Sequence, residues 1–222
     1  MEECRLKDRC KKYPQCEGYC IKRFKIETLC DKALLTKKQR QYISLHIDAD
    51  GTDREVFKTL KNVEKNIKSF VEEGHCLYIN SVKVGNGKTS WSLRLLNAYI
   101  EKIWAGSDLS CAALFIHVPQ FLLALKNNIS SKNEYAEHIK ENILDADLVV
   151  FDEIGTKSLT VYEGEHLLSI INSRIDFGKS NIYTSNLRPE ELKEVVGDRL
   201  YSRIVNNSYN ITLLGQDKRG IQ

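Results

Sequence analysis

Short apolar runs alternate with amphipathic stretches along most of the chain. The runs predict strands at residues 76–80, 112–118, 148–151, 181–184 and 209–214, of which the second and third are expected to be buried. Apolar residues at helical spacing predict helices at residues 52–74, 88–104, 119–125, 134–144, 163–177, 189–196 and 200–205. The first of these helices opens with Thr52 and Glu55, which have the spacing of a capping box. Fully apolar strands separated by helices are typical of a parallel sheet with helices on both faces, so we expect an α/β fold.

The N-terminal part of the chain follows a different pattern. Residues 1–30 contain too few aliphatic side chains to fold alone without a staple, and residues 31–51 are typical of a connector. The charge is also uneven, because residues 1–40 hold 12 Lys and Arg against 6 Asp and Glu, whereas the whole chain has a net charge of only +3. We therefore predict a small basic module with its linker over residues 1–50 and a main domain over residues 51–222.

Composition excludes several classes of protein. The chain has 222 residues, of which 42% are hydrophobic and 28% are charged, which are ordinary proportions for a globular protein. No apolar stretch approaches the roughly 20 residues that a membrane-spanning helix needs. The charged N-terminus does not resemble a signal peptide. These features predict a soluble, cytoplasmic protein.

Five of the seven cysteines lie within the first thirty residues, at Cys4, Cys10, Cys16, Cys20 and Cys30. In a reducing compartment such a cluster indicates a metal site rather than disulfides. Cys4, Cys10, Cys16 and Cys20 would supply the four thiolates of a tetrahedral Zn²⁺ site, and Cys30 could replace Cys4. The alternative is a set of reduced thiols in a loose segment. The basic residues between the cysteines could contact nucleic acid.

The strongest chemical signal is the segment SVKVGNGKTS at residues 81–90, between a predicted strand and a predicted helix. It predicts a phosphate-binding P-loop, in which backbone N–H groups face phosphate oxygens at a helix N-terminus. Lys88 would reach the β- and γ-phosphates, and the Thr89 hydroxyl would bind Mg²⁺. The usual first glycine of this motif is replaced by Val82. The predicted nucleotide-binding residues of the loop are Gly85, Asn86, Gly87, Lys88, Thr89 and Ser90.

Two acidic residues end the third predicted strand. In the sequence DLVVFDE, Asp152 and Glu153 would lie at the carboxyl edge of a parallel sheet, where ligands bind in this architecture. We expect Asp152 to hold Mg²⁺ through water and Glu153 to act as the general base on the attacking water. The next predicted strand ends near Asn186, which could bond the γ-phosphate or this water.

Two arginines follow on one short predicted helix. Arg199 and Arg203 are four residues apart and so share a helix face. Such a pair usually forms surface salt bridges. In a ring or filament of subunits, one of them could instead reach a neighbour's γ-phosphate as an arginine finger.

This ordered set of features is similar to AAA+ ATPases. The narrower segments GNGKTSW, LFIHVPQFLLALK, FDEIG, NIYTSNL and GDRLYSRI, behind a cysteine-bearing N-terminus, resemble replicative helicase loaders of the DnaC/DnaI type, especially versions from phages of Gram-positive bacteria. The resemblance implies a P-loop AAA+ core without a lid domain, preceded by a zinc-binding module that contacts the helicase. By this resemblance Lys88 and Thr89 match Walker A, Asp152 and Glu153 match Walker B, and Asn186 matches sensor 1.

The resemblance implies an ATPase that hydrolyses ATP to ADP and phosphate, with Mg²⁺ and Zn²⁺ as metals. It also favours Arg203 over Arg199 as the finger. The implied partners are the hexameric replicative helicase, single-stranded DNA and further copies of this chain, which would form a ring or filament. Two alternatives remain open at this point. One is a transposase-assisting ATPase with a similar core, and the other is a non-catalytic, zinc-bearing helicase adaptor, which the residue Val82 keeps open.

Overall fold

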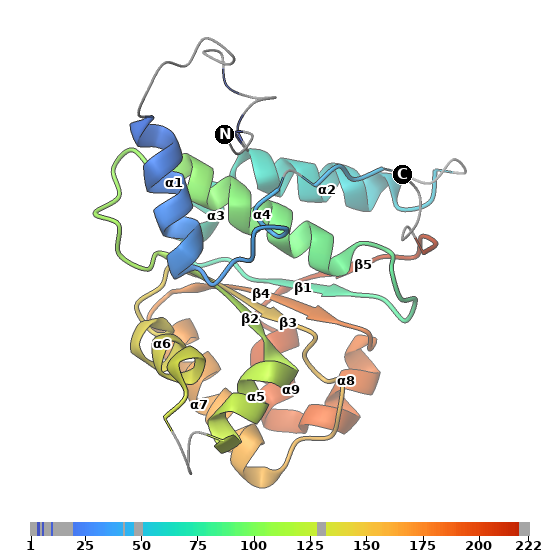
Figure 1. Ribbon diagram of the computed structural model, residues 1–222. Helices are drawn as coiled ribbons and strands as arrows, with labels where there is room; N and C mark the ends of the chain where they lie inside the picture. Colours follow the sequence, from blue (N-terminus) through green and yellow to red (C-terminus); the bar gives the residue numbers. More distant parts are fainter. Residues whose placement is uncertain are drawn as a thin grey trace.

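A five-stranded parallel sheet divides the protein into two helical layers (Figure 1). The computed structural model describes residues 20–41, 43–46, 51–127 and 132–217, together with Cys4, Leu6 and Cys10. The strands follow the order β2-β3-β4-β1-β5, and each paired strand is parallel to its neighbour. Their bounds are β1 Leu77–Asn80, β2 Ala113–His117, β3 Leu148–Asp152, β4 Ser180–Ser185 and β5 Tyr209–Thr212. The predicted α/β class and all five predicted strands are confirmed.

Two groups of helices cover the two faces of the sheet (Figure 1). One face carries α1 Ile21–Lys32, α2 Arg54–Lys65, α3 Ile67–Glu72 and α4 Lys88–Ile103. The other face carries α5 Val118–Asn127, α6 Glu134–Asn142, α7 Val161–Asp176, α8 Pro189–Val196 and α9 Asp198–Val205. None of the helices in the described part of the chain is long and apolar enough to cross a membrane.

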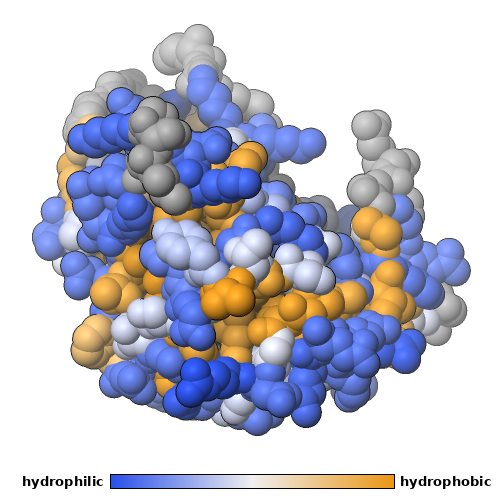
Figure 2. All heavy atoms as spheres, turned by 90° about the horizontal axis from the view of Figure 1, so that it is seen from below, coloured by the Kyte–Doolittle hydropathy of each residue, from blue (hydrophilic) through white to orange (hydrophobic). Residues whose placement is uncertain are grey.

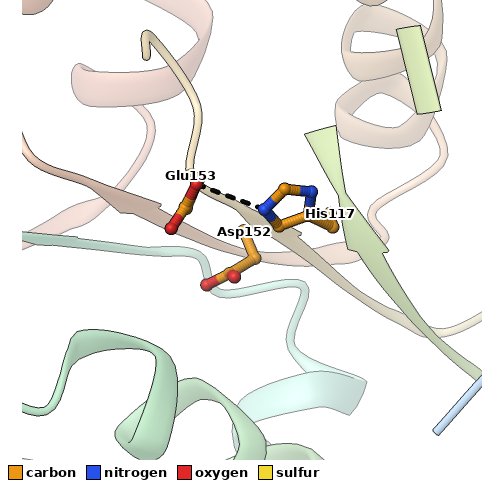
Figure 3. Close-up of side chains that lie close together, drawn as sticks. All are labelled: His117, Asp152 and Glu153. Carbon is orange, nitrogen blue, oxygen red and sulfur yellow. Dashed lines mark hydrogen bonds and ion pairs between the residues drawn. The ribbon is translucent and has the colours of Figure 1, made fainter. Parts of the chain in front are cut away.

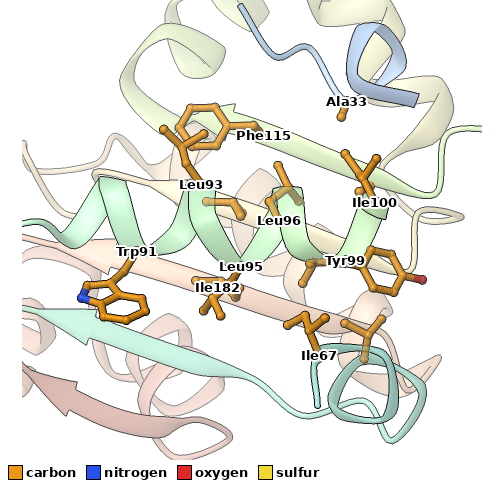
Figure 4. Packing of buried hydrophobic residues seen from close by; sticks show 14 of the residues in the cluster. Ala33, Ile67, Trp91, Leu93, Leu95, Leu96, Tyr99, Ile100, Phe115 and Ile182 are labelled. Atoms are coloured by element: carbon orange, nitrogen blue, oxygen red, sulfur yellow. The ribbon is translucent and has the colours of Figure 1, made fainter. Parts of the chain in front are cut away.

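Side chains of β1, β2 and β3 alternate between two hydrophobic cores, one on each face of the sheet, whereas the edge strand β5 buries only Ile211. In β1, Leu77 and Ile79 join the core beneath α4, whereas Tyr78 joins the core on the opposite face. Both sets are buried because helices cover both faces, and this explains why the strands read as continuous apolar runs. Figure 4 shows α4 lying along the sheet, with its residues Trp91 and Leu95 directed into the first core.

The helix predicted over residues 52–74 is divided, and its predicted capping box is wrong. Helix α2 begins at Arg54 and α3 follows after Asn66. Asp53, in a left-handed conformation with φ 66°, occupies the N-cap position, and no side chain caps the helix. Glu55 pairs instead with Lys58, at 2.7 Å. The Asp53 carboxylate instead accepts backbone N–H groups from Leu214 and Gly215, both at 2.8 Å. These two bonds fix the chain after β5.

Helix α1 lies in a segment for which we predicted no element. Its residues Ile26, Leu29 and Cys30 are buried in the same core as α4. The backbone also joins this segment to the sheet, since the N–H of Phe115 donates to the carbonyl of Ala33 at 3.0 Å. Helix α1 and Ala33 are therefore packed against α4 and the sheet, while the boundary at residue 50 remains a prediction.

Candidate active site

The loop between β1 and α4 has the backbone shape that a phosphate-binding loop needs. Gly85 and Gly87 have φ values of 76° and 102°, which favour glycine. Gly87 is the N-cap of α4, and no side chain caps that helix, so its first N–H groups remain directed at the loop. Val82 has no left-handed backbone, and its side chain is 49% exposed. A side chain is tolerated at this position because it lies on the outside of the loop.

Lys88 is held inside the loop. Its Nζ donates to the carbonyls of Lys83 at 2.9 Å and Ser81 at 3.3 Å. Asn86 braces the same loop, because its Nδ2 donates to the Ser81 hydroxyl and to the carbonyl of Leu213. Carbonyl oxygens are weaker partners for an ammonium group than phosphate oxygens are. The loop is thus arranged so that Lys88 can exchange these carbonyls for a phosphate.

Asp152 ends β3 and is almost fully buried. Its Oδ1 accepts hydroxyl donors from Thr89 at 2.9 Å and Thr184 at 2.7 Å. Burial raises the pKa of Asp152, and the two hydroxyl donors act in the opposite direction because they stabilise the carboxylate. The Thr89–Asp152 contact joins the P-loop helix to β3 and brings together the two residues predicted to hold Mg²⁺, a role that stays a prediction.

Glu153 follows in a left-handed conformation with φ 61°. Its Oε2 lies 3.2 Å from Nε2 of His117, at the end of β2, and its backbone N–H donates to the Thr184 hydroxyl at 3.0 Å. Figure 3 shows His117, Asp152 and Glu153 together at the ends of β2 and β3. Among the residues that the structure describes, this is the one group of three ligand-type side chains whose donor atoms lie within 4.8 Å of one another.

Most of the residues predicted for the nucleotide site line one cavity of about 210 Å³. It is lined by the P-loop and by the ends of β3 and β4, and the predicted residues in its wall are Gly85, Gly87, Lys88, Thr89, Ser90, Glu153 and Asn186. Asp152 lies behind Thr89, through their hydrogen bond. The Asn86 side chain is buried within the loop and takes no part in the wall. The strand order explains the grouping, because β1, β4 and β3 are neighbours and their carboxyl ends meet at one edge.

Sequence reasoning missed Thr184 and His117. Both residues lie at the end of a strand that neighbours the strand ending in Asp152. This position is the signal that could have identified them. The parallel register places His117 opposite Asp152 and places Tyr183, the residue before Thr184, opposite Phe151. This register depends on the order of the strands in the sheet, which the sequence pattern did not give.

Arg199 and Arg203 do not line this cavity. Both lie on α9, exposed, in the wall of a separate groove of about 750 Å³ against α7. Within the described residues neither guanidinium forms an ion pair, so the simple expectation of a surface salt bridge is not met there. Sites that a subunit offers to its neighbour have to face outward, and this position is compatible with such a role.

The cysteine cluster is only partly described. Cys4 and Cys10 are half-buried and pack against the first core. Cys20 is the N-cap of α1, where its Sγ accepts the N–H of Arg23 at 3.5 Å. Within the described residues these three thiols do not form a metal-binding group. Cys16 lies outside the described residues, so the zinc site remains a prediction. Cys30, the alternative ligand, is fully buried in the core.

The chemistry of the cavity fits a nucleotide with a magnesium ion. An uncapped helix N-terminus and Lys88 provide positive charge for phosphates, and the Thr89 hydroxyl with the Asp152 carboxylate provides oxygen ligands of the kind that Mg²⁺ prefers. Glu153 lies in the same wall, where a carboxylate can accept a proton from water.

Sequence comparison assigns the chain to a family. The sequence pattern of the IstB-like ATP binding proteins matches residues 36–216. The chain belongs to this family. The replicative helicase loader DnaC of Escherichia coli (strain K12) is 24% identical to this IstB-like chain over 161 residues, which are 71% of this chain and 60% of the loader. The chain thus spans about 60% of the length of this curated relative.

Solved structures show the same fold. The crystal structure of the DnaC helicase loader has a TM-score of 0.63 and 19% identity to the IstB-like chain, and the match covers 80% of this chain and 99% of that one. The crystal structure of DnaI has a TM-score of 0.60 and 17% identity, with 83% and 94% covered. The predicted resemblance to DnaC/DnaI-type loaders is confirmed, and with it the AAA+-like architecture of the sheet.

Proposed function

We propose that this IstB-like protein is an ATP-dependent loader of a replicative DNA helicase, which it helps to place on single-stranded DNA. The observation that carries the proposal is the single cavity that Lys88, Thr89, Glu153 and Asn186 share, with Asp152 directly behind it. An adaptor that never uses nucleotide has no need for a basic loop, a magnesium carboxylate and a second carboxylate in one wall. The similarity to helicase loaders named DnaC supports the choice of partner.

In this proposal the chain hydrolyses ATP to ADP and phosphate. Lys88 leaves the loop carbonyls to bind the β- and γ-phosphates, and the N–H groups at the start of α4 bind the same oxygens. Mg²⁺, when bound, supplies positive charge against the phosphates, and Thr89 and Asp152 are the residues that hold it. Glu153 accepts the proton of the attacking water, and Asn186 orients that water or the γ-phosphate.

Self-association completes the proposed site. Arg203, or else Arg199, contacts the nucleotide of a neighbouring subunit from the exposed face of α9. The face formed by α5 to α9 also exposes apolar side chains, among them Leu123 and Val161, which are 59% and 85% exposed. Figure 2 shows apolar side chains gathered across this face. Such patches are typical of surfaces that bind other proteins, here further subunits or the helicase.

The cysteine-bearing N-terminal segment forms the remaining part of the proposal. Cys4, Cys10, Cys16 and Cys20 hold Zn²⁺, and this module contacts the helicase. Single-stranded DNA is bound through its backbone, without sequence preference. ATP binding favours the assembled state, and hydrolysis or release resets it.

The test is a loading assay with the full chain, the replicative helicase of its host cell and circular single-stranded DNA. Helicase retained on DNA is measured with ATP, without nucleotide and with the Lys88→Ala variant. Lys83→Ala is the matched control, because Lys83 lies in the same loop but its Nζ bonds the carbonyl of Leu214. The proposal predicts ATP-dependent loading that Lys88→Ala abolishes and Lys83→Ala retains. Loading that is equal with and without ATP would contradict it.

A parallel capture experiment separates the main alternative. The family is named for IstB, and a transposase-assisting ATPase would share this ATP site. The tagged chain is mixed with the purified helicase in one reaction and with a purified transposase of a neighbouring mobile element in another. Capture of the helicase alone supports the loader, and capture of the transposase alone overturns it.

A further inference from the structure

Two consecutive carboxylates lie at the same cavity, with Glu153 in its wall and Asp152 directly behind Thr89. A regular extended strand would direct them to opposite sides, because neighbouring side chains of such a strand point to opposite faces of the sheet. Here β3 ends at Asp152, and Glu153 adopts the left-handed conformation with φ 61°. This turn brings the Glu153 side chain to the wall of the cavity while Asp152 contacts Thr89. A left-handed conformation is costly for a glutamate, so it persists only where surrounding groups hold it.

Thr184 in β4 is the residue that contacts this turn at three points. Its hydroxyl accepts the backbone N–H of Glu153 at 3.0 Å and donates to Oδ1 of Asp152 at 2.7 Å. Its carbonyl accepts the N–H of Ile154 at 2.9 Å. A backbone N–H can only donate, so the one hydroxyl proton is left for the carboxylate. Thr184 is 1% exposed, so water does not compete for these bonds.

We propose that Thr184 is a positioning residue for the ATPase reaction, whose hydroxyl sets the carboxylates of Asp152 and Glu153 relative to each other. The proposal rests on the proposed function, because it assigns Asp152 to Mg²⁺ and Glu153 to water. Thr184 also borders the cavity, but its hydroxyl is engaged by the Glu153 N–H and the Asp152 carboxylate, so it acts through these two residues. Asn186, two residues later, lines the same cavity, so the end of β4 supplies both a proposed catalytic residue and the residue that holds the turn.

The decisive pair of variants is Thr184→Val and Thr184→Ser. Valine keeps the branched shape and strand preference of threonine but has no hydroxyl, whereas serine keeps the hydroxyl and loses one methyl group. If Thr184 serves only to fill the sheet, valine is the milder change. If the hydroxyl positions the carboxylates, serine is the milder change. Thr212→Val is the matched control, because this β5 threonine bonds Asn80 and no carboxylate.

Three measurements on the full chain test the proposal. Hydrogen exchange of the Glu153 amide in nucleotide-free protein should be faster in Thr184→Val than in wild type, Thr184→Ser or Thr212→Val. Binding of a non-hydrolysable fluorescent ATP analogue should be unchanged without Mg²⁺, but Thr184→Val should lose most of the gain that Mg²⁺ gives. ATP turnover of Thr184→Val should fall about 10- to 100-fold, the range usual for residues that orient metal ligands.

Wild-type exchange at Glu153 in Thr184→Val, or equal defects in Thr184→Ser and Thr184→Val, would overturn the proposal. The exchange measurement needs no nucleotide, so it decides the role of Thr184 even if the wild-type chain does not hydrolyse ATP. An absence of ATP hydrolysis in the wild-type chain would instead remove hydrolysis from the proposed function.

Discussion

Arg174 on α7 is fully buried and donates to four acceptors around the amino ends of β3 and β4. Its guanidinium bonds Oδ1 of Asn181 at 2.6 Å and the carbonyls of Ile143, Ala146 and Ser180 at 2.5, 2.7 and 2.8 Å. Within the described residues no carboxylate pairs with it. Replacing Arg174 with methionine keeps the apolar stem and removes all four donors. We predict a marked loss of stability.

The expected magnitude follows from two opposing effects. Hydrogen bonds with one charged partner contribute about 1.5 kcal/mol each, so four bonds contribute about 6 kcal/mol. Burial lowers the pKa of Arg174 to about 10, because desolvation disfavours the charged guanidinium. Taking an ion out of water costs several kcal/mol, here about 3 kcal/mol, and methionine does not carry this cost. The net loss is about 3 kcal/mol, or a melting temperature lower by about 6–12 °C in a chain of this size.

Differential scanning calorimetry of Arg174→Met and of the exposed-site control Arg188→Met measures this loss. Arg174→Lys should lie between wild type and Arg174→Met, because an ammonium group has fewer donors and no fork to reach opposite acceptors. A melting temperature of Arg174→Met within about 2 °C of wild type would refute the reasoning, since it would mean that the four acceptors find other donors at little cost.

Further predictions concern the proposed site, the assembly and the metal. Glu153→Gln should bind ATP normally and lose hydrolysis by about 10²-fold or more in a phosphate-release assay, and unchanged turnover would exclude it as the base. Arg203→Ala should bind ATP with near-normal affinity but lose hydrolysis, and mixing it with Lys88→Ala should restore some activity, since one variant keeps the pocket and the other the finger. A mixture of folded, associating variants that stays inactive would argue against action between subunits. Elemental analysis should find close to one zinc per chain, which Cys16→Ser should release, and freshly purified protein without zinc would contradict the cysteine site.

The strands and the P-loop were predictable because their signals are local. A strand buried on both faces requires a continuous apolar run, and the loop requires glycines next to Lys88 and Thr89. The position of Asp152 at the end of a strand was also predictable, because the apolar run before it is a local signal. The hydrogen bonds from Thr184 to Asp152 and Glu153 were not predictable. They depend on β4 lying beside β3, which is a property of the strand order.

The stretch of α1 and the start of α2 were predicted wrongly for a different reason. In α1, Ile26, Leu29 and Cys30 have helical spacing, but the helix is otherwise highly charged, and its stability comes from packing on α4 and β2. At the start of α2, Asp53 was available as a cap but bonds two N–H groups after β5 instead. In both cases a contact with a distant part of the chain overrides the local signal.

The central claim is that the P-loop cavity binds ATP through Lys88, and equilibrium titration with a fluorescent ATP analogue tests it most directly. Wild type and Lys83→Ala should bind the analogue with similar affinity, and both should bind more tightly when Mg²⁺ is present. Lys88→Ala should show little or no binding, because the backbone N–H groups alone do not neutralise a triphosphate. Wild-type affinity in Lys88→Ala would contradict the account.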